Sequence, residues 1–326
     1  LTEVRKLTLH NLDTLSCYQM FANSSPLSVH DLTFGTMALQ ACNQMFYNNT
    51  NLASLYNIKA NKIGKEAAKN MFQTCAKLTQ IHDIEVNEVD TMGCQEMFNG
   101  SCKTATGSVH NIHITTLRPN ACQSMFASCT GLDSVYNLSA ETIGESACYL
   151  AFNGCTGIDT IGNLQATTIE ANGCLQMFNG CTANLKIDQL KAKNVGEYGC
   201  SQMFNNCTQL SHVGTLEADV VGEHGWDRMF QGINKVAKTT IRAIVDTIRV
   251  NKIEINGCYR MFYSAEANAS TSNANTSRLS QVRYFRANQV ADSACFEMFR
   301  NCVYLSIIPD TLYAKTVGTD GYRNMF

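Results

Sequence analysis

The chain has 326 residues, of which 45% are hydrophobic and 16% charged, so it carries enough apolar surface to fold and lacks the composition of a disordered protein. Its formal net charge of −2 argues against general nucleic-acid binding and against a polybasic membrane-surface patch, since both need a basic excess. No stretch approaches about eighteen consecutive apolar residues, so membrane insertion is not expected.

A Met-Phe pair recurs along the chain and defines an internal repeat. Most copies follow one another at 26-residue intervals, so we predict one continuous repeat solenoid over residues 1–326, of about twelve units. Irregular units with insertions are expected at 231–257 and 263–279. Because the chain begins and ends inside a repeat, both ends are expected to be truncated. With Ala151-Phe152 as a variant copy, the anchors lie at 20–21, 45–46, 71–72, 97–98, 125–126, 151–152, 177–178, 203–204, 229–230, 261–262, 298–299 and 325–326.

The first half of each unit has the pattern of a β-strand. In one well-formed copy the apolar residues are Leu132, Val135, Leu138, Ala140 and Ile143. This short spacing and the β-branched bias suit a strand that buries its side chains against the copies above and below it. We therefore predict one strand per unit.

The second half of each unit has a helical period. Cys148, Phe152 and Cys155 lie at positions i, i+4 and i+7, which form one face of a short helix. We predict an α/β repeat solenoid, similar to leucine-rich repeats, with one short strand and one short helix per unit. The predicted inward-facing structural core includes Cys148, Phe152, Cys155, Cys200, Phe204 and Cys207.

The repeat also resembles a known family. Residues Cys174 to Leu190 follow the frame Cys-x-x-Met-Phe-x-x-Cys-x-x-Leu-x-x-Ile-x-x-Leu, with one extra residue before Leu185. This frame resembles the bacterial surface-protein 26-residue repeats grouped as BspA-like leucine-rich repeats, and the likeness extends over nearly the whole chain. The resemblance implies a cell-surface or secreted protein with a role in adhesion and a protein or glycan ligand.

The sixteen cysteines occupy two positions of the repeat, three residues before Met and four or five after it. On a helix the two positions would be about 10 Å apart, beyond the disulfide reach of about 7 Å. No Cys-x-x-Cys occurs, so no metal site is predicted. We predict buried free thiols that pack as small apolar residues. So many thiols also suggest a reducing or anaerobic setting, in tension with a surface location.

No catalytic residue or cofactor is predicted, because repeated positions leave no unique constellation of nucleophile, base and orienting group. His110 and His113 could form a metal pair, but no third ligand is close in sequence, so solvated side chains are expected. Trp226, the only tryptophan, replaces a cysteine of the repeat; packing is favoured there over a ligand platform.

Two adjacent positions between the second and third apolar residues form columns along the solenoid. The second column is expected to hydrogen-bond the neighbouring backbone as an asparagine ladder. The first combines aromatic and imidazole side chains, which suits a ligand-binding stripe; positions merely free to vary are the alternative. The ladder comprises Asp31, Asn57, Asp83, Asn111, Asn137, Asn163, Gln189, Thr215, Thr247 and Thr311. The stripe comprises His30, Tyr56, His82, His110 and Tyr136, and the column continues as Gly162, Asp188, Gly214 and Asp246.

These features predict a non-catalytic, adhesin-like binding module that binds a protein or glycan through one face of the solenoid. Neither nucleic acid nor membrane insertion is expected. The alternative is a structural or spacer component of a larger assembly, such as a phage particle or a secreted lattice, in which case self-assembly is possible.

Overall fold

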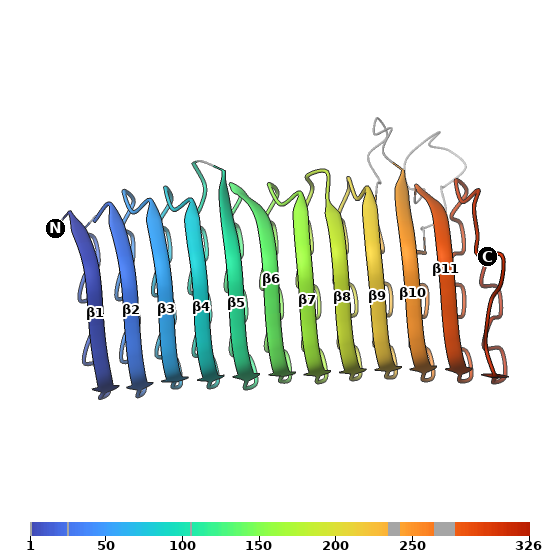
Figure 1. Cartoon of the computed structure of the whole chain (residues 1–326), viewed down its shortest axis with the longest axis horizontal. Coiled ribbons are helices and arrows are strands. Elements are labelled where there is room, and N and C mark those ends of the chain that lie inside the picture. The colour runs from blue at the N-terminus through green and yellow to red at the C-terminus, as the bar shows by residue number, and fades with distance from the viewer. Residues whose placement is uncertain (1, 25, 105, 234–241, 264–277) are drawn as a thin grey trace, which may run out of the picture.

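The computed structural model describes residues 2–24, 26–104, 106–233, 242–263 and 278–326. The predicted repeat solenoid is confirmed, and it is a parallel β-solenoid whose strands form one twelve-stranded sheet in chain order. Figure 1 shows the strands side by side and pointing the same way, from the N-terminal end to the C-terminal end. They are β1 (Glu3–Leu12), β2 (Ser28–Met37), β3 (Ser54–Ile63), β4 (Gln80–Val89), β5 (Gly107–Leu117), β6 (Leu132–Ile143), β7 (Thr160–Ile169), β8 (Lys186–Val195), β9 (His212–Val221), β10 (Ala243–Ile253), β11 (Leu279–Val290) and β12 (Thr316–Val317).

Equivalent positions of successive coils pair in register. Leu55 of β3 pairs with Ile81 of β4, and Ile63 with Val89, so like side chains lie above like side chains. The apolar residues of successive coils form one continuous core, so each coil depends on its neighbours for burial, as expected for a repeat array. Of the predicted irregular units 231–257 and 263–279, residues 234–241 and 264–277 lie outside the described residues.

The strands do not alternate strictly between the two faces of the sheet. Strand β3 buries Leu55 and Ile58 and leaves the two residues between them, Tyr56 and Asn57, partly exposed. Backbone pairing with both neighbouring strands skips Tyr56. The local bend explains the apolar spacing of three, and it places two adjacent columns of polar side chains on the outer face.

The predicted helix is wrong. No described residue is helical, and the second half of each coil is a run of turns. In the second coil the backbone takes positive φ at Gln40 (53°), Gln44 (57°) and Asn48 (56°), every fourth residue. The backbone N–H groups of this run point alternately to a carbonyl of the same turn and to a carbonyl of the next coil. Met45 N donates to Cys42 O within a turn (3.1 Å), whereas the next N–H, that of Phe46, donates to the following coil.

A four-residue turn period explains why the helical interpretation failed. It brings Cys148 and Phe152 to the same inner side, as the 3.6-residue period of a helix would. A positive φ costs a non-glycine residue on the order of 1 kcal/mol or more. Hydrogen bonds within turns and between coils offset that cost, because they satisfy the backbone of this half of the coil. The leucine-rich-repeat-like α/β fold is thereby replaced by an all-β solenoid.

A column of stacked phenylalanines forms the centre of the core. Successive rings lie 4.7–5.4 Å apart between centroids, close to parallel, without interruption along the described coils. Offset stacking at this distance adds to the free energy gained from burying each ring. The column comprises Phe21, Phe46, Phe72, Phe98, Phe126, Phe152, Phe178, Phe204, Phe230, Phe262, Phe299 and Phe326.

All sixteen cysteines are free and buried, beside the phenylalanine column. Cys148, Cys155, Cys200 and Cys207, with Phe152 and Phe204, are therefore part of the packed interior. In the first cysteine column, the neighbouring Cys94 thiol and burial raise the pKa of the Cys122 thiol well above its usual value.

The second cysteine column has a polar role that the sequence interpretation missed. Here the thiol donates a hydrogen bond to the phenylalanine carbonyl of the preceding coil, as Cys155 Sγ does to Phe126 O at 3.0 Å. In two coils that lack cysteine at this position, another donor takes over: Asn49 Nδ2 lies 3.0 Å from Phe21 O, and Ser101 Oγ lies 2.6 Å from Phe72 O. The coil of Phe230 is an exception, because it places the buried aliphatic Ile233 there. Most described coils therefore carry a hydrogen-bond donor at this position. The other thiol donors are Cys75, Cys129, Cys181, Cys207 and Cys302.

Candidate functional site

The five residues of the predicted stripe form a continuous stack on the outer face of strands β2 to β6. The rings of His30 and Tyr56 lie 4.6 Å apart, and those of Tyr56 and His82 lie 4.9 Å apart, with interplanar angles of 3° in both pairs. His82 and His110 follow at 4.9 Å, and His110 meets Tyr136 edge-on at 5.4 Å. In-register pairing of the strands thus brings these side chains into direct contact.

The stripe offers both apolar and polar groups to a ligand. Tyr136 is 45% exposed, and the other four side chains are partly exposed. The Nε2 atom of His30 lies 2.8 Å from the Glu3 carboxylate. The Nε2 atom of His82 is buried and has no hydrogen-bond partner. The stripe therefore combines ring surface with one unsatisfied polar atom, which is costly unless water or a ligand satisfies it.

The stripe ends at Gly162 for a steric reason. A Cβ atom at Gly162 would lie 2.3 Å from the carbonyl oxygen of Tyr136, so the backbone there has no room for a side chain. Gly214 stands in the same relation to Asp188, at 2.2 Å. The aromatic column is therefore confined to β2–β6. Beyond it the same column carries Asp188 and Asp246, and the Asp246 carboxylate lies 2.7 Å from His212 and 2.9 Å from Arg283.

Beside the stripe, the predicted polar ladder is present between Asp31 and Asn163, with partners different from those expected. Asn57 Nδ2 donates to Asp31 Oδ1 at 2.7 Å, and Asn111 Nδ2 donates to Asp83 Oδ1 at 2.7 Å. Asn137 then donates to Asn111 at 2.8 Å, so the bonds run from side chain to side chain. The expected bonds to the neighbouring backbone are absent from these described pairs. The ladder holds the strands' outer side chains in fixed orientation next to the stripe.

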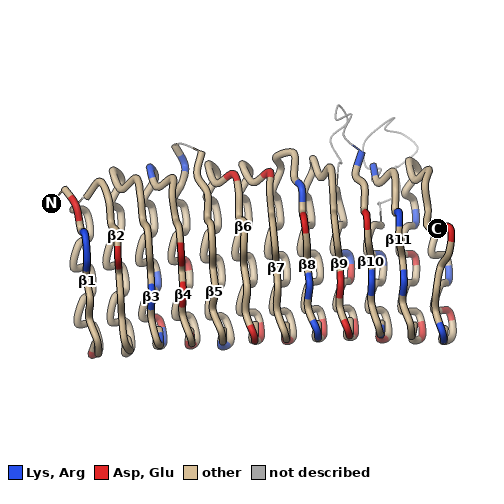
Figure 2. The backbone as a smooth tube through the Cα atoms, in the orientation of Figure 1, with Lys and Arg blue, Asp and Glu red and all other residues tan. Residues whose placement is uncertain are grey.

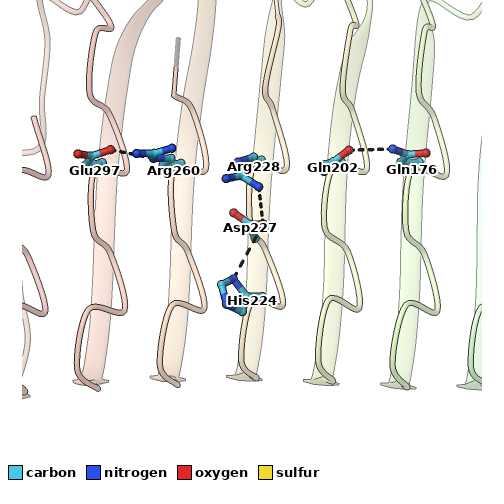
Figure 3. A network of polar contacts seen from close by, with 7 residues as sticks. All are labelled: Gln176, Gln202, His224, Asp227, Arg228, Arg260 and Glu297. Carbon is cyan, nitrogen blue, oxygen red and sulfur yellow. Dashed lines mark hydrogen bonds and ion pairs between the residues drawn. The ribbon is translucent and has the colours of Figure 1, made fainter. Parts of the chain in front are cut away.

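A second group of polar residues lies on the turn side of the coils of β7–β11, away from the outer sheet face (Figure 3). Asp227 is only 3% exposed, and burial raises the pKa of its carboxyl against the opposing effects of Arg228, His224 and Arg260. Its Oδ1 has no partner, and its Oδ2 lies 3.9 Å from His224 Nδ1, too far for a hydrogen bond. Neighbouring Trp226 is fully buried.

Arg228 and Arg260 of this cluster belong to a column of residues, mostly polar, that lie immediately before Met of the anchors. Gln176 donates to Gln202 at 2.8 Å, and Arg260 to Glu297 at 2.7 Å. These residues have positive φ. The sequence signal was the polar residue that precedes most Met-Phe pairs, and it was overlooked because a helix was expected there.

In the part of the chain that the structure describes, no group of three or more His, Cys, Asp and Glu side chains could hold a metal ion. His110 lies in the stripe, whereas His113 lies in another column, where its Nδ1 is 2.8 Å from Ser139 Oγ. Among the described residues there is also no helix long and apolar enough to cross a membrane.

The fold and the outer columns define the chain as a repeat protein of the β-solenoid class. It belongs to the family described as "Mycoplasma protein of unknown function, DUF285", whose model matches residues 15–139 and 172–298. No curated protein and no solved structure matches the chain.

Proposed function

We propose that the chain is a non-catalytic binding module that presents the outer face of its sheet to a protein or glycan ligand. The stacked stripe of His30, Tyr56, His82, His110 and Tyr136 carries this proposal. Partial similarity of the repeat frame to BspA-like surface repeats supports an adhesin-like role at the cell surface. Neither nucleic acid nor insertion into a membrane is part of the proposal.

Rigid presentation of the stripe favours binding. A ligand that contacts Tyr56 and its neighbours meets side chains already ordered by stacking and by in-register strands. Little conformational entropy is then lost on association, and such pre-organisation raises affinity. Tyr and His also combine ring area with polar tips, as binding surfaces of proteins commonly do.

A binding role fits the described side chains better than catalysis. The His–Asp pair of the turn-side cluster, His224 and Asp227, is 3.9 Å apart and lacks the hydrogen bond that orients a catalytic base. The thiols are buried and act as packing residues and donors to the backbone. Therefore the stripe is proposed as a contact surface and not as an active centre.

The proposal is tested by changing Tyr56, His82, His110 and Tyr136 together to Ser. Binding of the wild-type chain and of the variant to an array of immobilised extracellular-matrix proteins and purified polysaccharides is measured, together with thermal stability. The stripe variant should lose at least one interaction of the wild type while remaining folded. Unchanged binding to every component would contradict the role of the stripe.

A matched control changes exposed or half-exposed residues on the same four strands outside the stripe: Lys62, Glu88, Thr116 and Thr142 to Ser. This control should bind as the wild type does.

A structural role is the second candidate, and the uninterrupted phenylalanine column favours it. Stacked core residues such as Phe152, Phe178 and Phe204 continue through the described coils and make a long, regular body suited to a spacer. Sedimentation of the purified chain separates the two candidates. A monomer with a saturable ligand supports binding, whereas self-assembly without any ligand supports a lattice or particle component.

A further inference from the structure

We propose that the outer face carries a second binding site, an axial groove from β2 to β9 that binds a neutral polysaccharide of repeating units. This inference rests on the proposed function in taking the outer face as the ligand-binding face. It assigns a site separate from the stripe, and it specifies the ligand by chemical class.

The groove consists of two shallow hollows that share His113. One, of about 380 Å³, lies over β2–β5, and the other, of about 340 Å³, lies over β5–β9. Small residues such as Ala140 and Ala166 line the bottom. Polar side chains line both walls, for example Ser139 and Gln165 on one side and Thr167 on the other. With a strand spacing of about 4.8 Å, the eight strands from β2 to β9 span roughly 34 Å.

Charges along the groove balance one another, which favours an uncharged ligand. Lys59 Nζ lies 2.8 Å from Glu85, and Lys191 Nζ lies 3.4 Å from Glu217. Figure 2 shows the same mixture, with acidic residues on β4 and β9 and basic residues on β3 and β8. A strongly charged polymer would therefore find no excess of opposite charge along these strands.

The periodicity of the walls favours a periodic ligand. From β3 to β9 each strand contributes one side chain at the position of Gln165 and one at that of Thr167, so the same two columns recur from coil to coil. On β2 the second of these positions is Gly35, which adds no wall group. Hydroxyl, amide, amine and carboxylate groups recur there, and these can donate to or accept from sugar hydroxyls. Many weak, equivalent contacts add up only for a ligand that repeats along the same axis.

A polypeptide fits this groove less well. From β2 to β9, each strand already pairs with a neighbour on both sides, so this face offers no free backbone edge for an added strand. The groove is shallow and uniform, whereas protein partners are usually anchored by large side chains in discrete pockets.

The test uses affinity electrophoresis of the full chain in gels that contain dextran, pullulan, mannan or galactan. Gels with dextran sulfate or with reduced, carboxymethylated casein provide the charged-polymer and polypeptide comparisons. At least one neutral polysaccharide should retard the wild-type chain, and longer oligomers of that polysaccharide should bind more tightly until they span the groove. Retardation by casein or by dextran sulfate alone would overturn the proposal.

Two variants locate the site. Ser139→Trp with Gln165→Trp fills the groove and should weaken binding at least about tenfold, as expected when most contacts are lost. The milder pair Gln165→Ala with Lys191→Ala removes wall groups without adding bulk, and should also weaken binding if the Trp pair fails to fold. The matched control, Thr142→Trp with Thr168→Trp, lies on the same strands β6 and β7 outside the groove and should bind normally.

The outcome for the groove is separable from that for the stripe. A chain that loses array binding in the stripe variant but is retarded by no neutral polysaccharide would leave the proposed function standing and overturn the groove. Retardation that persists in both groove variants would also overturn it. Retardation that persists in the stripe variant and disappears in the groove variants would assign the polysaccharide to the groove.

Discussion

Substitutions of Cys155 distinguish a thiol that donates a hydrogen bond from one that only fills space. Its Sγ lies 3.0 Å from Phe126 O and is fully buried. Cys155→Ala removes the hydrogen bond, worth about 0.5–1.5 kcal/mol net. It also removes buried apolar volume comparable to a methylene group, worth about 0.8 kcal/mol. The free energy of unfolding should therefore fall by about 1.3–2.3 kcal/mol.

Cys155→Ser should be the milder change, because the hydroxyl can donate to the same carbonyl. Ser101 already does so to Phe72 O at 2.6 Å in the natural sequence. If the thiol were only an apolar filler, the order would reverse, since burying an unpaired hydroxyl costs about 1–3 kcal/mol. The sign of the difference between the Ser and Ala variants thus decides the question.

Urea denaturation followed by circular dichroism measures both variants against the wild type. Repeat arrays can unfold in more than one step, so the transition midpoints are compared alongside the fitted free energies. A Cys155→Ala chain that is more stable than the Cys155→Ser chain would refute the donor role of this cysteine column.

Three further predictions follow from the core. Phe178→Ala should lower the free energy of unfolding by about 3–5 kcal/mol in denaturant titration, because the ring is buried between Phe152 and Phe204; a loss below about 1 kcal/mol would contradict the column. A thiol reagent at mildly alkaline pH should label none of the sixteen cysteines in the native chain and all of them after unfolding, because they are buried and burial raises the pKa of Cys75, for example, to about 12. Asp227→Asn should raise the melting temperature at pH 7 but not near pH 4. Burial raises the pKa of the Asp227 carboxyl in the folded chain, so folding favours the protonated acid. The wild type therefore loses stability as the pH rises from about 3.8, the ordinary pKa of the carboxyl, through its folded-state pKa. An equal effect at both pH values would exclude this linkage.

The repeat and its strand could be predicted because their signals are regular. The interval between Met-Phe pairs gives the length of the repeat. The short spacing and β-branched bias of the apolar residues, as at Leu132, Val135 and Leu138, indicate a strand, and β6 is found there. The stripe could also be placed, because equivalent positions of a 26-residue repeat must stack when the strands pair in register.

The turn half could not be predicted from the same kind of pattern. Cys148, Phe152 and Cys155 fit a helix and a four-residue turn series almost equally well, and propensities give no expectation of positive φ at Ser146 or Leu150. One signal was present: Gly and Asn recur two residues after the anchor Phe, as at Gly154, and both residue types favour this backbone region.

The partners of side-chain hydrogen bonds could not be predicted from the sequence either. The ladder residues could be recognised, but whether Asn57 bonds to a neighbouring backbone or to Asp31 depends on the exact strand spacing and bend. Likewise, thiol donation by Cys155 depends on the position of a carbonyl in another coil. Burial of the thiols, which raises the pKa of the Cys122 thiol for example, lowers their reactivity in the folded chain.

Far-UV circular dichroism of the purified chain tests the β-solenoid itself most directly. A spectrum of the β type, without the double minimum of α-helices, is expected because the described coils consist of parallel strands and turns. A strong helical contribution would contradict the stacking of turns and strands on which the phenylalanine column, the stripe and the groove all depend.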